Sequence, residues 1–123
     1  MSIFAPIEKF LNEVVTEYKM EVRVASNTAA ENCALSPQSM KHLIVANARA
    51  LGAMQALETI RQTVAYSKTA DMDLAAAENE ALPRVIRAVE QSMDMHLHSE
   101  ESHPGTIRVL NDVRKSLRIL SEG

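Results

Sequence analysis

The sequence predicts an all-α protein: a compact bundle of four to five amphipathic helices that pack as antiparallel neighbours in a single domain spanning residues 1–123. Two observations support this fold class. Apolar residues recur at the three- and four-residue spacing of a helical face in several segments, and capping residues stand where those segments begin. Glycine is also scarce, at three residues, whereas alanine, leucine, glutamate and methionine, which favour helices, are common.

The first predicted helix begins near Pro6, which suits the first turn because its missing N–H has no helical partner there. Its apolar face is Ile7, Phe10, Leu11, Val14, Val15, Tyr18 and Val22. Residues 18–24 also alternate between apolar and charged side chains as a strand would, but no second alternating segment exists to pair with them. We therefore expect a helix to about residue 23.

A short separate helix is predicted next, because Thr28 and Glu31 have the spacing of a capping box. This helix would end near Leu35. Ser36 then provides a capping hydroxyl for the second long helix, and Pro37 suits the first turn of that helix.

The second long helix carries the longest apolar face of the sequence. Its members are Met40, Leu43, Ile44, Asn47, Leu51, Met54, Leu57, Ile60, Arg61 and Val64, of which only the asparagine and the arginine are polar. Ala48, Gly52 and Ala56 form another face of small side chains, which lets a second helix approach closely. That second helix belongs either to the same chain, which is the preferred interpretation, or to the other copy in a homodimer.

The third and fourth helices are each predicted from a cap and an apolar face. Asp71 or Asp73 can cap the third helix, and Pro83 predicts either a kink in it or a break into two helices. Its apolar face is Val85, Ile86, Val89, Met93 and Leu97. Thr106 is the predicted cap of the last helix, after a turn that contains proline and glycine. The apolar face of that helix is Ile107, Leu110, Val113, Leu117 and Leu120.

Composition and charge narrow the classes of function. Cys33 is the only cysteine, so no disulfide forms within the chain, which fits a reducing compartment such as the cytoplasm. No export signal and no apolar run of the roughly 20 residues needed to span a bilayer is present. The net charge is −3, and it is concentrated at −6 over residues 69–103, which disfavours binding to the phosphate backbone of nucleic acid.

Three histidines, His96, His98 and His103, lie close together beside acidic residues. Imidazole and carboxylate groups suit zinc, so binding of a metal or a small molecule at this cluster is the alternative function. The segment has neither HExxH nor paired CxxC spacing, and histidines near the end of a helix also stabilise its negative pole without a ligand. We therefore expect no metal and no cofactor.

No nucleophile–base motif, glycine-rich phosphate loop or paired-carboxylate arrangement occurs, so we expect no enzyme activity. A helical scaffold without such motifs favours a regulatory, inhibitory or adaptor protein that binds another protein, as small accessory proteins of bacteria and phages do. The predicted contact residues are Arg114, Lys115 and Arg118 of the basic last helix and Asp71, Asp73 and Glu78 of the acidic middle region. A third hypothesis assigns the basic last helix to nucleic-acid binding.

Overall fold

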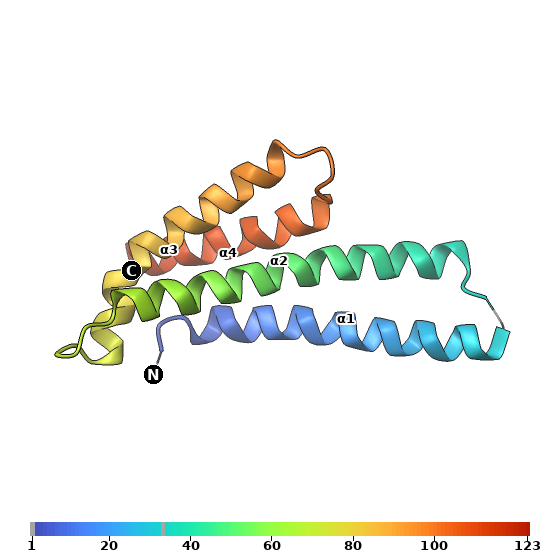
Figure 1. The fold of residues 1–123 in the computed structure, drawn as a ribbon, viewed down its shortest axis with the longest axis horizontal. Coiled ribbons are helices and arrows are strands. Elements are labelled where there is room, and N and C mark those ends of the chain that lie inside the picture. The colour runs from blue at the N-terminus through green and yellow to red at the C-terminus, as the bar shows by residue number, and fades with distance from the viewer. Residues whose placement is uncertain (1, 33) are drawn as a thin grey trace.

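The computed structural model describes residues 2–32 and 34–123, which form four helices and no strand. They are α1 (Ala5–Asn32), α2 (Pro37–Ser67), α3 (Leu74–Leu97) and α4 (Pro104–Glu122). In Figure 1, α1 and α2 form a long antiparallel hairpin, and the shorter pair of α3 and α4 lies along one half of it. The predicted all-α bundle is therefore confirmed, with four helices. Cys33 lies outside the described residues.

α1 is longer than predicted, because residues 24–32 continue it without a break. Residues 18–24 are accordingly helical, and the strand alternative is wrong. Thr28 and Glu31 lie inside α1 and do not cap a separate helix. This segment contains three alanines and neither glycine nor proline, so nothing in its local sequence stops a helix that has already formed.

The starts of α2 and α3 are capped as the sequence predicts. The Ser36 hydroxyl accepts a hydrogen bond from the Ser39 N–H at 3.1 Å, and the Asp73 carboxylate accepts one from the Ala76 N–H at 2.8 Å. Each bond satisfies an N–H that has no partner inside the helix. Pro83 lies inside α3, which bends in its first half but continues as one helix (Figure 1).

The start of α4 differs from the prediction. His103 caps this helix, because its ring Nδ1 accepts a hydrogen bond from the Gly105 N–H at 2.9 Å. Thr106, the predicted cap, is buried, and its hydroxyl donates to the Ala48 carbonyl of α2 over 2.7 Å. This bond between two helices places the start of α4 opposite Ala48.

The small-residue face of α2 allows this close contact. Ala48, Gly52 and Ala56 are all buried, and a Cβ added to Gly52 would lie 2.9 Å from the carbonyl oxygen of Thr106. The close approach that these residues predict therefore occurs within the chain, between α2 and α4.

The hydrophobic core lies where the α1–α2 hairpin overlaps α3 and α4, and it is mostly aliphatic. Its largest fully buried side chains are Phe4, Leu11, Ile60, Val85, Val89, Val109, Leu110, Val113 and Leu117. The apolar faces predicted for α3 and α4 supply much of this core, except that Leu97 at the end of α3 is 62% exposed. None of the helices in the described ranges has the length and apolarity needed to cross a membrane.

The apolar face predicted for α2 contains residues from two different sides of the helix, one buried and one exposed. Leu57 and Ile60 are buried in the core. Met40, Ile44, Leu51 and Met54 are between 45% and 54% exposed. Because α2 has apolar residues on most of its sides, periodicity alone did not identify the buried side, which is the one rich in alanine and glycine.

We predict that Gly52→Ala lowers the free energy of unfolding by about 1–2 kcal/mol. Alanine gains about 1 kcal/mol in helix propensity, but forcing a methyl group against the Thr106 backbone costs more. Urea denaturation measures the difference. Arg61→Ala, at an exposed position of the same helix, serves as the control and should change stability by less than about 0.5 kcal/mol. A Gly52→Ala protein as stable as the original would contradict the close packing of α2 on α4.

Candidate functional site

The end of the α1–α2 hairpin projects beyond α3 and α4 (Figure 1). Because α4 starts opposite Ala48, residues 37–47 of α2 extend about 16 Å past that start, at 1.5 Å per residue. Glu17 of α1 forms an ion pair with Arg49 of α2. The part of α1 that runs alongside residues 37–47 of α2 therefore begins near Glu17. We call residues 18–32 and 37–47 the distal hairpin.

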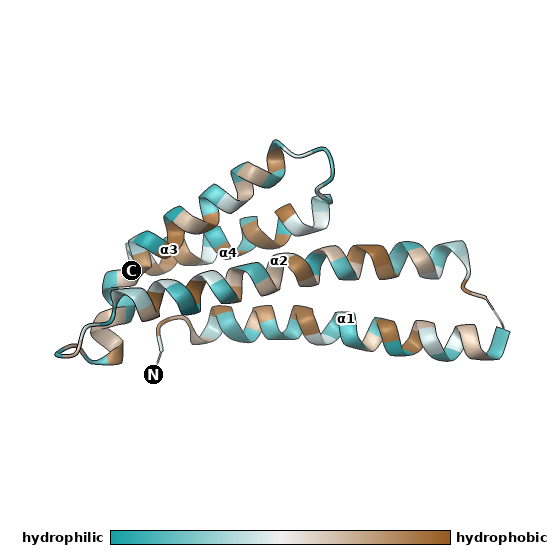
Figure 2. Ribbon diagram, viewed as in Figure 1, coloured by the Kyte–Doolittle hydropathy of each residue, from teal (hydrophilic) through white to brown (hydrophobic). Residues whose placement is uncertain are grey.

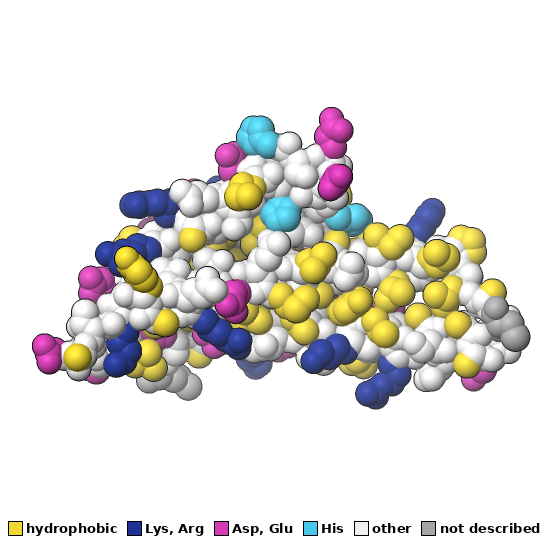
Figure 3. Space-filling model, viewed as in Figure 1, with side chains coloured by type: hydrophobic (Ala, Val, Ile, Leu, Met, Phe, Trp, Pro, Cys, Tyr) yellow, Lys and Arg dark blue, Asp and Glu magenta, His cyan; other side chains and the backbone are white. Residues whose placement is uncertain are grey.

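The distal hairpin buries very little of its apolar surface. Among the described residues from 15 to 47, Ala25 alone is buried. Figure 2 shows hydrophobic positions on both helices out to this end, and Figure 3 shows hydrophobic side chains gathered along them on one face. The exposed large apolar residues here are Met20, Val22, Val24, Met40, Ile44 and Val45. Helices with this pattern are normally covered on more than one side, so the distal hairpin lacks a further layer of structure.

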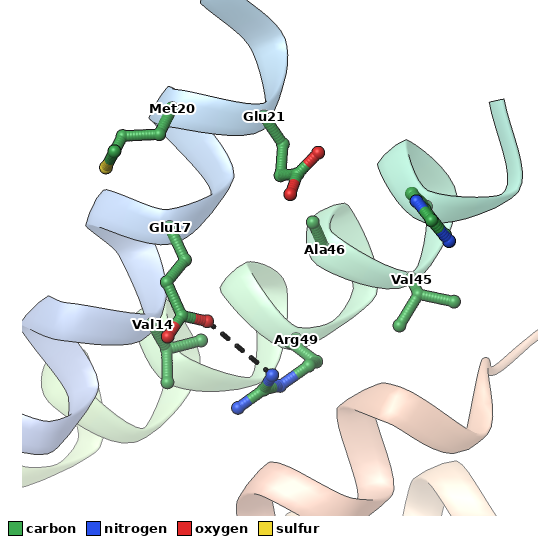
Figure 4. A pocket seen from close by; sticks show the side chains of 8 residues that line it. Val14, Glu17, Met20, Glu21, Val45, Ala46 and Arg49 are labelled. Carbon is green, nitrogen blue, oxygen red and sulfur yellow. Dashed lines mark ion pairs between the residues drawn. The ribbon is translucent and has the colours of Figure 1, made fainter. Parts of the chain in front are cut away.

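One side of the distal hairpin is hollowed into a groove of about 370 Å³ between α1 and α2 (Figure 4). We call it the hairpin groove. Its lining residues are Val14, Glu17, Met20 and Glu21 of α1 and His42, Val45, Ala46 and Arg49 of α2. The lining thus combines apolar side chains with two carboxylates from α1 and two basic side chains from α2.

An ion pair crosses the inner end of the hairpin groove. Arg49 Nη1 lies 3.6 Å from Glu17 Oε2, and the two side chains are 38% and 62% exposed (Figure 4). Water screens such a pair, which contributes at most about 1 kcal/mol to stability. Both charged groups therefore remain available to a bound molecule at little cost to the fold.

The hairpin groove continues the surface that α4 covers elsewhere on α2. Val45 precedes Ala48 by three residues and Gly52 by seven, so all three lie on one side of the helix. Ala48 and Gly52 contact the start of α4, whereas Val45 lies past it and is exposed. A helix from another molecule, laid in the hairpin groove, would therefore contact the side of α2 that α4 covers farther along.

The structure does not bring the three predicted histidine ligands together. The His98 ring Nδ1 lies 2.8 Å from the Asp94 carbonyl oxygen of its own helix, and His103 caps α4. His96 contacts other residues. Within residues 2–32 and 34–123, no group of three or more histidine, cysteine, aspartate or glutamate side chains is placed to hold a metal ion.

His96 links the α3–α4 turn to α2. Its Nδ1 lies 2.6 Å from Ser102 Oγ, and its Nε2 lies 3.0 Å from Gln55 Oε1. A hydroxyl beside an imidazole is also found in acyl-transfer enzymes, where backbone N–H groups stabilise the oxyanion. Here the N–H groups of Ser99 and Ser102 donate to carbonyl oxygens of the turn itself. These contacts support a structural role for His96.

The predicted basic contact residues of α4 differ in their surroundings. Arg118 Nη2 donates to both carboxylate oxygens of Glu90 on α3, at 2.9 Å each. Arg114 donates to Asn111 of its own helix at 3.0 Å, and Lys115 is exposed. Two of the three side chains are thus engaged within the chain, and a role in partner binding stays a prediction.

The predicted acidic contact residues also have different surroundings. Glu78 is only 4% exposed, and its carboxylate accepts a hydrogen bond from the Ser2 hydroxyl. Asp73 caps α3, and Asp71 lies exposed in the preceding turn. Glu78 therefore attaches the N-terminal segment to α3 and presents little surface to a partner.

The distal hairpin was not identified from the sequence, although a signal existed. The sequence of α2 has apolar residues on most sides of the helix, although the helix packs its buried residues on one side only. Comparisons of the chain with protein-family models, with curated proteins and with solved structures find no match. The geometry of the distal hairpin therefore provides the basis for a functional assignment.

We predict that His96→Ala lowers the free energy of unfolding by about 1–2 kcal/mol, because Gln55 and Ser102 lose a shared partner at a half-buried position. Chemical denaturation measures this loss. The control is His98→Ala, since the His98 side chain is 78% exposed and should contribute little. Equal stabilities of the two variants would show that the His96 contacts do not stabilise the fold.

Proposed function

We propose that this protein is a non-enzymatic regulatory or adaptor protein that binds an amphipathic helix of a protein partner in the hairpin groove. The observation that supports this function is the uncovered apolar surface between α1 and α2, next to the position where α4 packs on the same side of α2. We also propose a cytoplasmic location, which the single cysteine supports.

The apolar residues of the hairpin groove would supply most of the affinity. Met20 is 61% exposed and Val45 is 43% exposed, so a helix that covers both removes a substantial apolar area from water. Complete burial of an exposed side chain of this kind contributes about 1.5–3 kcal/mol. Both residues lie on helices that exist before binding, so little conformational entropy is lost on this side of the interface.

The charged residues of the hairpin groove would set the orientation of the bound helix. Glu17 and Glu21 belong to α1, whereas His42 and Arg49 belong to α2. The expected partner is therefore a helix with apolar residues at three- and four-residue spacing, basic residues along the edge facing α1 and acidic residues along the other edge. Charges at the rim of an interface mainly affect the association rate and exclude wrong partners.

We predict that Met20→Glu and Val45→Glu each weaken partner binding at least tenfold, because a carboxylate would be buried among apolar groups. The partner is first captured from cells of the source organism with the unmodified protein and identified by mass spectrometry. Its helical segment is then produced as a peptide, and its affinity for each variant is measured by calorimetry.

Ile119→Glu provides the matched control, because Ile119 is an exposed apolar residue of α4, outside the distal hairpin. This variant should bind the peptide with unchanged affinity. A partner that binds Met20→Glu and Val45→Glu as tightly as the unmodified protein would exclude the hairpin groove as its binding site. Circular dichroism confirms that each variant keeps its helical content.

A further inference from the structure

We propose that the chain forms a homodimer in which the outer side of α2 pairs, antiparallel, with the same side of α2 in a second copy. The exposed residues Met40, Ile44, Leu51 and Met54 form this surface, which we call the outer stripe. By helical spacing the outer stripe lies on the side of α2 opposite Arg49, and hence opposite the hairpin groove. The homodimer therefore rests on a different observation from the proposed function.

The spacing of the outer stripe is that of a coiled-coil seam. Residues 40, 44, 47, 51, 54 and 58 are separated alternately by four and by three positions, which places them along one line of the helix. Four of these six residues are large and apolar. The two polar members are Asn47 and Glu58.

Further exposed apolar side chains flank the outer stripe and would add to a dimer interface. Val22 follows Met20 by two residues, which places it on the side of α1 opposite Met20 and the hairpin groove. Met95 of α3 lies beside Gln55 of α2. Together with the outer stripe, these residues make a set of large apolar side chains that are between 36% and 75% exposed. A homodimer interface of standard size buries about 800 Å² per copy, of which about 65% is apolar. Figure 3 shows hydrophobic side chains following α1 and α2 across one face.

Charge complementarity favours a second copy as the occupant and an antiparallel arrangement. If Asn47 faces Leu51 of the second copy, Ile44 faces Met54 and Met40 faces Glu58. Lys41, beside Met40, then lies near Glu58 of the second copy, and symmetry repeats this pair. Both side chains are exposed, and within the described ranges neither belongs to an ion pair of its own chain. Parallel pairing would instead keep Lys41 and Glu58 apart, at opposite ends of the seam.

A dimer of this kind also gives the distal hairpin the layer it lacks. The α1–α2 pair of one copy would pack on that of the second copy and form a four-helix arrangement. The hairpin grooves would then face outward on both sides. Two partner helices could bind one dimer, which raises the avidity for a partner that is itself dimeric.

Sedimentation equilibrium of the full chain tests the homodimer. We expect a species of twice the 13.6 kDa chain mass at concentrations of about 10–100 µM. Ile44→Glu and Leu51→Glu should each weaken dimerisation at least 30-fold, because each buries two carboxylates at the centre of the interface. Both positions are exposed in the single chain, so the variants should stay helical by circular dichroism.

Two controls separate this interface from other surfaces. Leu74→Glu changes an exposed apolar residue at the start of α3 and should remain a dimer. Val45→Glu, in the hairpin groove, should also remain a dimer, so that failure of partner binding and failure of dimerisation are distinguished. A monomeric chain at 100 µM, or a dimer that Leu51→Glu leaves intact, overturns the homodimer.

A charge exchange tests the antiparallel register. Lys41→Glu and Glu58→Lys should each weaken the dimer about three- to tenfold, because each places like charges together twice. The double variant should regain most of the original affinity. If the double variant is weaker than both single variants, the antiparallel register is wrong.

Discussion

The close approach of α4 to α2 determines how the rest of the molecule is arranged. Gly52 lets the Thr106 backbone contact α2, and Ala48 and Ala56 lie one turn away from it on the same side. The Thr106 hydroxyl donates a hydrogen bond to the Ala48 carbonyl. This contact fixes where α4 begins along α2. Since α4 has 19 residues and α2 has 31, the first turns of α2 extend past the four-helix core. The projecting distal hairpin follows from this one contact and the difference in helix length.

The two halves of the molecule therefore differ in how they are packed. In the half that contains α3 and α4, apolar side chains from all four helices fill a common core. In the distal half, α1 and α2 have only each other, and their remaining apolar residues face outward on two sides. The distal hairpin extends from this core as the continuation of two long helices, so its exposed apolar side chains lie on regular helical backbone.

Many of the charged and polar side chains that the sequence suggests as contact residues or metal ligands make contacts within the fold. Asp73 and His103 cap helices, whereas Glu78 and His96 connect segments that are far apart in the chain. Helix ends and turns leave backbone groups without partners, so side chains near them are used for hydrogen bonding. The distal hairpin, by contrast, exposes large apolar side chains such as Met20, Ile44 and Val45.

The sequence by itself determined that the protein is helical, where α2 and α3 begin, and which faces of α3 and α4 are buried. Caps and periodicity depend on the local sequence. The caps are Ser36 and Asp73, and the periodicity is clearest in the leucine-rich face of α4. Only the tertiary structure decided that Thr106 bonds to α2 and that Met40, Ile44, Leu51 and Met54 lie outside the core. A helix that is apolar on most sides does not specify which side is buried; the length and position of its neighbours do.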